Sequence, residues 1–461
     1  MSARDLFIQA IYLAASVLFI LGLKSLSHPD KARLGMQQAA VGMVLAIVGT
    51  LFHHEIVRFD LVAVALILGS VIGYPLGMFV PMTAMPQRIA ISHMFGALAA
   101  TLVGVAEYRM HGAAIPRSTM AALGFEVLFG GLTVTGSFMA FGKLQELITG
   151  TPVTYRGQNA VNITLFGVAI VMFLSLIFNP GNATVFYGMI GLALLLGIFM
   201  VLPIGGADMP VVVSLLNSYA GLASSATGFV IENNVLIICG ALDGASGFLL
   251  SILMSKAMNR SFGNVLFGAF GSPPAIAAGE KPKDLTVSSV SAEDAAMRMA
   301  YAGEVIVVPG YGMAVAQAQH VVRELADLLE KRGVTVKYAI HPVAGRMPGH
   351  MNVLLAEANV PYDRLYDMEQ INSEFPQADV ALVIGANDVV NPAARSDPSS
   401  PIYGMPILDV DRAKGVIVLK RSMNPGFAGI ENALFYSPNT SMLFGDAKSS
   451  LTRLVSEVKA L

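Results

Sequence analysis

The chain has 461 residues, of which 54% are hydrophobic and only 13% are charged. A water-soluble domain usually carries about 25% charged residues, so we expect much of this chain to lie in lipid. The net charge of -2 says little about partners, and the lack of a basic tract argues against nucleic acid. The single cysteine, Cys239, lies in an apolar run, which excludes a disulfide framework and a cysteine-based metal site.

The first 260 or so residues contain apolar stretches near the length of about 20 residues that a membrane-spanning helix needs. Nine such stretches are predicted at 5–23, 36–53, 58–80, 87–106, 121–142, 160–178, 183–202, 209–230 and 234–256. The first lacks the small-x-small cleavage site of a signal peptide and is followed by more spans. Several stretches are rich in Gly, Ala and Ser, which favours close helix packing, as between Gly73 and Gly77 and in 240–247.

The positive residues predict the orientation of these spans. Alternate loops carry most of them: Lys24, Lys31, Arg33, Arg88, Lys143, Arg156, Lys256 and Arg260. The positive-inside rule places these loops in the cytoplasm. With nine spans, the N-terminus is then outside and the C-terminal domain is cytoplasmic.

Polar residues inside spans are costly in lipid, so they are candidates for function. His93 lies ~10 Å into the fourth span and Asn217 ~13 Å into the eighth, at the rise of an α-helix. Histidine titrates near neutral pH, and asparagine can hold a water or orient the ring, so the pair is a candidate proton site. The alternative for His93 is a bond to a backbone carbonyl that only fixes helix packing.

Three acidic residues are further candidates in this half. For Glu126 and Asp243, both inside spans, a proton-handling role and a structural role stay open. Asp208 begins a helix, and its simplest role is that of an N-cap.

Residues 263–291 are rich in Pro, Gly, Ala, Ser and Lys, which predicts a flexible linker between a membrane domain (1–262) and a soluble domain (292–461). A short helix is expected to start after Ser291. Strands are predicted at 304–309, 334–340, 379–384, 416–420 and 441–444, with a short one at 363–367, and helices at 313–332, 349–359 and 447–460. This alternation predicts a doubly wound parallel α/β sheet of the Rossmann-like class, with its ligand at the carboxyl ends of the strands.

The stretch 305–319 has the order that a dinucleotide-binding unit needs: an apolar strand, a glycine-rich turn and a helix. Gly310 permits a tight turn, and Gly312 lets a pyrophosphate approach the backbone. The helix N-terminus then offers free N–H groups to the phosphates. Val315 stands where the usual fingerprint has a third glycine.

The loops after other strands predict which nucleotide binds. The second strand leads into His341 without the acid that an NAD site uses for the ribose 2′-OH. Lys420, Arg421 and Ser422 offer two cations and a hydroxyl, which suit a 2′-phosphate and predict NADP(H) rather than NAD(H). The alternative for the two cations is an ordinary solvated charge pair. Asp388 is either a helix cap or a group sensitive to the redox state of the nucleotide.

The predicted NADP(H) contacts all come from loops at this edge of the sheet. They are Gly310, Tyr311, Gly312, Met313, Ala314, Val315, Val343, Ala344, Gly345, Arg346, Met347, Pro348, Gly385, Ala386, Asn387, Asp388, Val389, Gly404, Met405, Lys420, Arg421, Ser422, Met423, Asn424, Pro425, Gly426, Phe427, Asp446 and Ala447.

Several long motifs resemble those of the β subunit of bacterial proton-translocating NAD(P) transhydrogenase. They are PGYGMAVAQAQ (309–319), HPVAGRMPGHMNVLLAEA (341–358), IGAND (384–388), NPAA (391–394), GMPILDV (404–410), KRSMNPGFAG (420–429), GDAK (445–448), GGADMPVVVSLLNSY (205–219) and SKAMNRSF (255–262). The resemblance covers the full length of the chain.

The resemblance implies nine spans followed by an NADP(H)-binding domain in which the nucleotide lies reversed relative to the usual pose. It implies direct hydride transfer from NADH to NADP⁺, coupled to proton entry into the cytoplasm of a bacterium across its inner membrane. NAD(H) would be held by an α subunit that also carries further membrane helices, in a dimer of αβ units without metal or flavin. His93, Asn217 and Asp208 match the family's membrane histidine, membrane asparagine and junction aspartate. Phe427 stands where a tyrosine is expected, so a hydroxyl contact would be missing.

Two other classes of protein are alternatives to this one. A membrane transporter or channel gated by a cytoplasmic NADP(H)-sensing domain would need a substrate path, and the few intramembrane charges suit protons better than a bulky solute. A self-contained NADP-dependent membrane reductase would need a flavin, haem or cluster, and no ligand pattern for one is visible.

Overall fold

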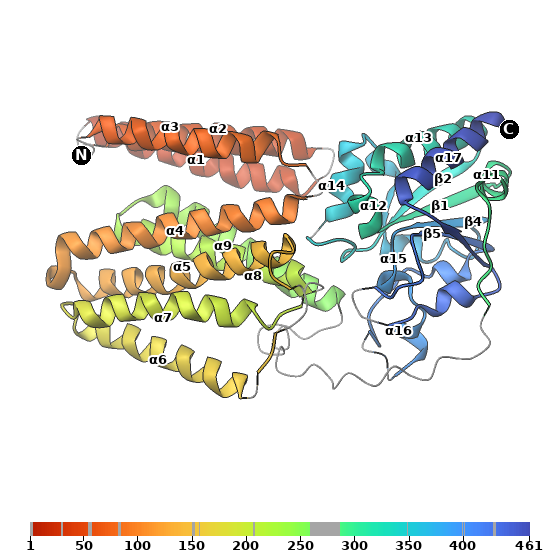
Figure 1. The fold of residues 1–461 in the computed structure, drawn as a ribbon. Helices are drawn as coiled ribbons and strands as arrows, with labels where there is room; N and C mark the ends of the chain where they lie inside the picture. The colour runs from red at the N-terminus through yellow and green to blue at the C-terminus, as the bar shows by residue number, and fades with distance from the viewer. Residues whose placement is uncertain are drawn as a thin grey trace. The chain divides into compact units, whose positions relative to one another are not determined.

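The computed structural model describes residues 3–28, 31–53, 58–81, 84–149, 153–155, 157–205, 208–258, 286–347, 349–398, 400, 402–426 and 430–461. The chain divides into two compact units. One comprises Met1–Ile204 with Val212–Ser251 and is helical, and the other comprises Gly205–Val211 with Ile252–Leu461 and contains a β-sheet (Figure 1).

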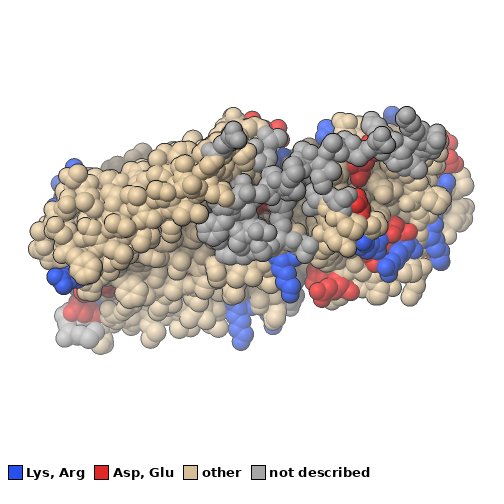
Figure 2. Space-filling view, turned by 90° about the horizontal axis from the view of Figure 1, so that it is seen from below, with Lys and Arg blue, Asp and Glu red and all other residues tan. Residues whose placement is uncertain are grey.

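Nine long helices occupy the described residues of the N-terminal part. They are α1 (Ala3–Leu26), α2 (Ala32–Leu51), α3 (Phe59–Met78), α4 (Met85–His111), α5 (Arg117–Leu144), α6 (Gln158–Phe178), α7 (Ala183–Val201), α8 (Met209–Val230) and α9 (Asn234–Ala257). Eight of them are long and apolar enough to cross a membrane, and α8 is the exception. In Figure 2 the visible surface of the helical unit is largely free of charge along its length, as a lipid-facing surface requires.

The structure gives a physical reason for the lower hydropathy of α8. This helix is enclosed by protein on most sides: Val212, Leu216 and Ala223 are at most 1% exposed. Its hydroxyl groups bond within α8, as when Thr227 Oγ1 donates to the carbonyl of Ala223 at 3.0 Å, or to α9, as when Ser225 Oγ donates to the carbonyl of Ile237 at 3.1 Å. A helix shielded from lipid by its neighbours does not need an apolar surface. The prediction of nine spans is therefore supported for eight helices, and for α8 it stays a prediction.

Glycines bring the backbones of α8 and α9 into direct contact. A Cβ added at Gly221 would lie 2.4 Å from the backbone N of Gly244, and one at Gly240 would lie 2.4 Å from the N of Ser225. The expected close packing in 240–247 is confirmed. At Gly73 and Gly77, by contrast, nothing described in this chain lies within 4 Å of an added Cβ, so the same expectation fails there.

Six parallel strands form the sheet in the described part of the second unit. They are β1 (Glu304–Pro309), β2 (Thr335–Ile340), β3 (Leu365–Asp367), β4 (Val380–Ile384), β5 (Gly415–Lys420) and β6 (Thr440–Phe444), in the order β3-β2-β1-β4-β5-β6. All six were predicted to within one or two residues. This is the order of a doubly wound dinucleotide-binding sheet, so the predicted Rossmann-like fold is confirmed.

Both faces of the sheet are covered, which explains why the strands read as continuous apolar runs. The helices α11 (Ala292–Ala300), α13 (Gln319–Lys331) and α17 (Ala447–Ala460) pack together, on the side opposite α15 (Met368–Ile371) and α16 (Ala393–Ser396) in Figure 1. In the core, Ile306 and Val383 cluster with Phe375 and Leu408, all 0% exposed.

The single helix predicted at 313–332 is broken in two. The first part, α12 (Tyr311–Val315), closes when the N–H of Ala318 donates to the carbonyl of Met313 at 3.1 Å. Gln317 takes the left-handed conformation, with φ of 49°. Such a closure is usual at a helix C-terminus, although glycine is the commoner residue there, and no glycine marks this break in the sequence.

The predicted linker at 263–291 lies outside the described residues as far as 285. Its last residues run beside β6: the N–H of Met442 donates to the carbonyl of Ser288 at 2.7 Å, and that of Val290 donates to the carbonyl of Met442 at 3.0 Å. Ser291 caps the expected short helix, because its hydroxyl accepts from the N–H of Asp294 at 3.1 Å.

We predict that Gly221→Ala destabilises the protein by about 1–3 kcal/mol, because the added Cβ meets backbone that cannot give way. The measurement is the thermal unfolding midpoint in detergent, followed by circular dichroism. Gly73→Ala is the matched control in a helix of the same unit and should leave the midpoint unchanged or slightly raised. Equal midpoints for the two variants would contradict the backbone contact between α8 and α9.

Candidate functional site

The chain adds β2 and β3 on one side of β1, and β4, β5 and β6 on the other side. The boundary between β1 and β4 is therefore the turning point of the sheet. These strands are parallel neighbours, with Pro309 opposite Ile384, but the chain leaves them for strands on opposite sides of the sheet. In sheets of this kind a ligand binds at the carboxyl ends beside such a point. The glycine-rich turn after β1 and the Gly385–Asn387 segment after β4 meet there.

The glycines at this point join the loops after β1 and β4 to each other. The N–H of Gly310 donates to the carbonyl of Ile384, and that of Gly312 to the carbonyl of Gly385, both at 2.9 Å. A Cβ at Gly312 would lie 2.7 Å from the Cα of Gly385, which itself has a φ of +63°. The missing side chain therefore makes room for the loop after β4, and the approach of a pyrophosphate to this turn stays a prediction. These two N–H groups are not free to bind phosphate, contrary to expectation.

Arg346, Tyr311 and His350 cluster on the β2 side of this point. The Arg346 guanidinium lies over the Tyr311 ring, 4.4 Å from its centroid, and the Arg346 backbone N–H donates to Nδ1 of His350 at 3.0 Å. Burial, and then the charge of Arg346, lower the pKa of His350 to about 4. The ring is therefore neutral near pH 7, with its proton on Nε2, and it shapes the loop that presents Arg346.

His341 ties the loop after β2 to a distant segment. Its Nδ1 accepts the N–H of Val343 at 3.2 Å, so its Nε2–H donates to the carbonyl of Pro406, 2.9 Å away. Burial lowers the pKa of His341 to about 4, and the bond to Pro406 opposes this shift. The sequence placed His341 at the start of a loop but did not reveal this structural role, whose one signal was a histidine directly after a buried strand.

Lys420 and Asp388 come together on the β5 side. Lys420 ends β5; its Nζ donates to the carbonyl of Asn424 and lies 5.1 Å from the centroid of Phe435. Burial lowers the pKa of Lys420, and the nearby Asp388 carboxylate opposes this. The loop after β5 passes close to Asp388, because a Cβ at Gly426 would lie 2.6 Å from its Oδ1. Two predicted contact groups, distant in sequence, thus form one surface.

Two buried asparagines hold these loops in place. Asn432, 2% exposed, donates through Nδ2 to the backbone O of Asn387 at 2.9 Å and to its Oδ1 at 3.0 Å. Asn391 donates to the carbonyl of Glu431 at 3.0 Å. Asn432 was missed by the sequence reasoning. An asparagine in a loop predicts a turn, but the sequence does not say which distant loop it will bind.

Other predicted contacts are spread along the same edge. Arg421 and Ser422 are exposed next to Lys420. Met313 and Ala314 are 0% exposed, so their side chains belong to the core and only their backbone could meet a ligand. Pro348 lies outside the described residues, and so does Phe427, the position where a tyrosine is expected.

Three predicted contacts have structural partners. Asp446 caps α17, because its carboxylate accepts from the N–H of Ser449 at 3.1 Å. The N–H of Gly404 donates to the carbonyl of Ala394 at 2.8 Å, and Met405 packs against the small apolar cluster that contains Ala394. All three residues therefore stabilise the loops at this edge.

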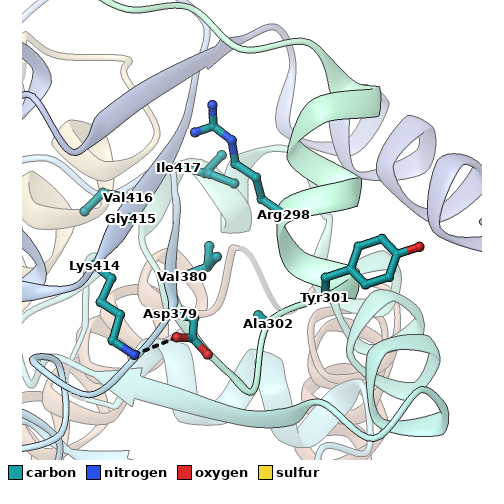
Figure 3. A pocket seen from close by; sticks show the side chains of 9 residues that line it. All are labelled: Arg298, Tyr301, Ala302, Asp379, Val380, Lys414, Gly415, Val416 and Ile417. Carbon is teal, nitrogen blue, oxygen red and sulfur yellow. Dashed lines mark hydrogen bonds and ion pairs between the residues drawn. The ribbon is translucent and has the colours of Figure 1, made fainter.

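A hollow of about 360 Å³ lies at the opposite edge of the sheet (Figure 3). Asp379 and Lys414, which lie just before β4 and β5, form an ion pair of 2.8 Å across it. This is the amino edge, where sheets of this class do not hold their ligand. Lys414 is therefore a suitable control for the lysine at the carboxyl edge.

The predicted pair in the helical unit also meets. His93 on α4 is within hydrogen-bonding reach of Asn217 on α8. Asn217 donates in turn from Nδ2 to Oδ1 of Asp243 on α9, at 3.0 Å. Three helices thus contribute one polar cluster.

Glu126 forms a second polar position in this unit. It is 0% exposed, beside Thr227 of α8, and a Cβ at Gly104 of α4 would lie 3.2 Å from its Oε1. Gly104 and Thr227 are 11 and 10 residues beyond His93 and Asn217, which is ~15 Å along each helix. Asp208 directly precedes α8, as its predicted place at a helix start requires.

Fold and site together define a multi-span membrane protein with a dinucleotide-binding α/β unit. A model of the family described as "NAD(P) transhydrogenase beta subunit" matches residues 8–457. The chain therefore belongs to this family, as the sequence motifs predicted.

Two relatives, both named "NAD(P) transhydrogenase subunit beta" and both from Rhodospirillum rubrum, are each 51% identical over 455 residues. The alignment covers 97% of this chain and 98% of each relative. A β subunit by name implies an α partner.

We predict that the buried His341 makes stability depend on pH. Its pKa is about 4 in the folded chain and about 6.5 when unfolded, so acid favours the unfolded state. As a result, the free energy of unfolding is highest above about pH 6.5 and is about 2 kcal/mol lower at pH 5 because of this histidine.

The measurement is the thermal midpoint at about pH 7 and about pH 5, for wild type and for His341→Gln. The variant cannot gain a proton there, so its midpoint should fall less on acidification. His350 titrates in both proteins and cancels in the difference. An equal fall would mean that His341 is not held neutral.

Proposed function

We propose that this chain is the NADP(H)-binding and proton-conducting subunit of a proton-translocating transhydrogenase. Hydride passes directly from NADH, held by an α subunit, to NADP⁺ at the carboxyl edge of the sheet. A proton crosses the helical unit into the cytoplasm. The observation that carries the proposal is the joining of Lys420 and Asp388 in one surface, beside the exposed Arg421 and Ser422.

This surface suits a nucleotide with an additional phosphate. Lys420 is partly desolvated, which disfavours its charged form. An anionic ligand beside it would stabilise that charged form. Arg421 offers a planar guanidinium to the same group. At the end of β2, His341 makes backbone contacts where an NAD site would present an acid. The nucleotide specificity proposed is therefore NADP(H), without metal or flavin on this chain.

The pose of the nucleotide is proposed to differ from the usual one. The N–H groups of Gly310 and Gly312, which would normally face a pyrophosphate, are bonded to the loop after β4. The phosphates would instead meet the loops that carry Arg346 and Lys420. This agrees with the reversed pose that the sequence resemblance implies.

The chemical step needs no acid or base from this chain. Hydride transfer is the chemistry of the two nucleotides when bound, and the protein supplies position and excludes water. The residues described above do this by fixing the loops: His341 on Pro406, Asn432 on Asn387, and Gly312 on Gly385.

Coupling is proposed to act through the protonation of His93. If proton occupancy there changes the relative affinity for NADP⁺ and NADPH, nucleotide binding must change proton affinity by the same free energy. The loops around Asp388 and 420–426 are the proposed moving parts, and the bonds of Asn432 to Asn387 would hold them in one of two positions. Glu126 and Asp208 are proposed as further stations on the proton pathway.

The proposed setting is the bacterial inner membrane, in a dimer of αβ units. If α8 crosses as a ninth span, the N-terminus lies outside and the nucleotide-binding unit lies in the cytoplasm. The alternative, a transporter gated by an NADP(H)-sensing domain, predicts solute flux that changes with NADP(H) and no hydride transfer with any α partner.

We predict that Lys420→Ala and Arg421→Ala each weaken NADP(H) binding about 10- to 100-fold, the value of a lost charge-assisted bond to phosphate. The measurement is calorimetric titration of the chain in detergent with NADP(H), and separately with NAD(H). Lys414→Ala, which removes an exposed cation at the opposite edge, should bind like wild type. A preference for NAD(H) in the wild type would contradict the proposed specificity.

We predict that His93→Ala and Asn217→Ala keep NADP(H) binding but lower proton translocation at least about tenfold. The first variant removes the imidazole that would bind the proton, and the second removes its hydrogen-bond partner. The assay uses the chain with its α partner in liposomes that contain a pH-sensitive dye, with NADPH formation followed in parallel. In His93→Ala the pH dependence of NADP(H) affinity should also flatten. Normal pumping by either variant would remove that residue from the pathway.

A further inference from the structure

Asp243 is an ionisable side chain to which the proposed function has given no role. It lies on α9, nine residues after Asn234 and 14 before Ala257, or ~14 Å and ~21 Å from the two helix ends. A carboxylate at that depth is costly and needs a polar partner.

Its partner is the asparagine of the proposed proton site. Nδ2 of Asn217 donates to Oδ1 of Asp243 at 3.0 Å. An amide has a second N–H and a carbonyl oxygen, so Asn217 can serve Asp243 and His93 at the same time. The order His93–Asn217–Asp243 thus joins α4, α8 and α9 through one amide.

The packing of α8 on α9 fixes this contact. A Cβ at Gly247 would lie 2.8 Å from Nδ2 of Asn217, so only glycine at this position leaves the amide its place. The Ser218 hydroxyl donates to the carbonyl of Gly244 at 2.7 Å, next to Asp243 in the chain. The carboxylate is therefore held against the amide by backbone geometry on both sides.

The remaining surroundings of Asp243 are open within this chain. Its side chain is exposed, and the other titratable groups near it are Cys239, one turn earlier on α9, and His93 across Asn217. Mid-membrane carboxyl groups face water or protein rather than lipid. Because a mid-membrane carboxyl group does not face lipid, we expect water or polar groups of a partner against the exposed side of Asp243.

We propose that Asp243 is a third proton-carrying residue of this cluster and receives protons at its open side. The inference rests on the proposed function. A proton from water binds a carboxylate oxygen of Asp243. The carboxylic acid then gives that proton, through water held at Asn217, to the imidazole of His93. The carboxylate is restored, an imidazolium forms, and no electrons are transferred.

The test compares Asp243→Asn, Asp243→Glu and His93→Ala with wild type. Each is assembled with the α partner in liposomes, and proton translocation and NADP(H) binding are measured. Asp243→Asn keeps the size of the side chain and can still bond to Asn217, but it cannot carry a proton. We expect it to lower proton translocation at least about tenfold with unchanged NADP(H) affinity. Asp243→Glu keeps the acid and should retain at least about half of wild-type translocation.

The outcomes separate this inference from the proposed function. Normal pumping by Asp243→Asn while His93→Ala fails would overturn the role of Asp243 alone. Normal pumping by both would overturn the proposed proton site itself. Equal loss in Asp243→Asn and Asp243→Glu would make Asp243 a packing residue and would also overturn the inference.

A spectroscopic measurement that leaves Asp243 unchanged guards against Asp243 variants that do not fold. The infrared difference spectrum between the NADPH-bound and NADP⁺-bound states should contain a protonated-carboxyl band that Glu126→Gln retains. A spectrum without such a band, or a band lost in Glu126→Gln, would contradict proton binding at Asp243.

Discussion

Direct backbone contact at glycine is the constraint on which both functional regions depend. In the helical unit, Gly221 and Gly244 let α8 approach α9 closely enough for Asn217 to reach Asp243. In the α/β unit, Gly312 and Gly385 let the loops after β1 and β4 lock together at the turning point of the sheet. In each case a larger side chain would push the two backbones apart. Asn217 would then no longer reach Asp243, and the loops after β1 and β4 would lose their hydrogen bonds to each other.

The α/β unit also uses polar side chains as neutral structural groups. His341 and His350 are buried rings whose pKa values are held near 4, so each serves near neutral pH as a fixed donor and acceptor rather than as a charge. Asn432 does the same with an amide. The charged groups, Lys420 and Arg346, stand on loops fixed by these neutral ones. Charge is thus kept at the edge where a ligand would meet it, and rigidity comes from groups that carry none.

The sequence reasoning was successful where the signal is local. Apolar runs predicted five of the six described strands, and the loops after them predicted that Lys420 and Asp388 share one edge, because the carboxyl ends of parallel strands lie together. It failed where the cause lies elsewhere in the chain. The break at Gln317 has no glycine to mark it, and the role of Gly312 depends on a loop some 70 residues later. The contact of Asn217 with Asp243 depends on how two helices are rotated about their axes, which composition does not specify.

The way the chain enters the sheet has a mechanical consequence. Ser288 and Val290 bond to Met442 in parallel register, so the entering segment extends the ladder beyond β6. A displacement of Thr286 along the strand direction would load both hydrogen bonds at once, in shear, rather than peel them apart singly. Shear of β6 is passed to β5, its neighbour, whose last residue is Lys420. Tension on the entering segment would therefore be felt at the carboxyl end of β5, the strand that lies between β6 and β4.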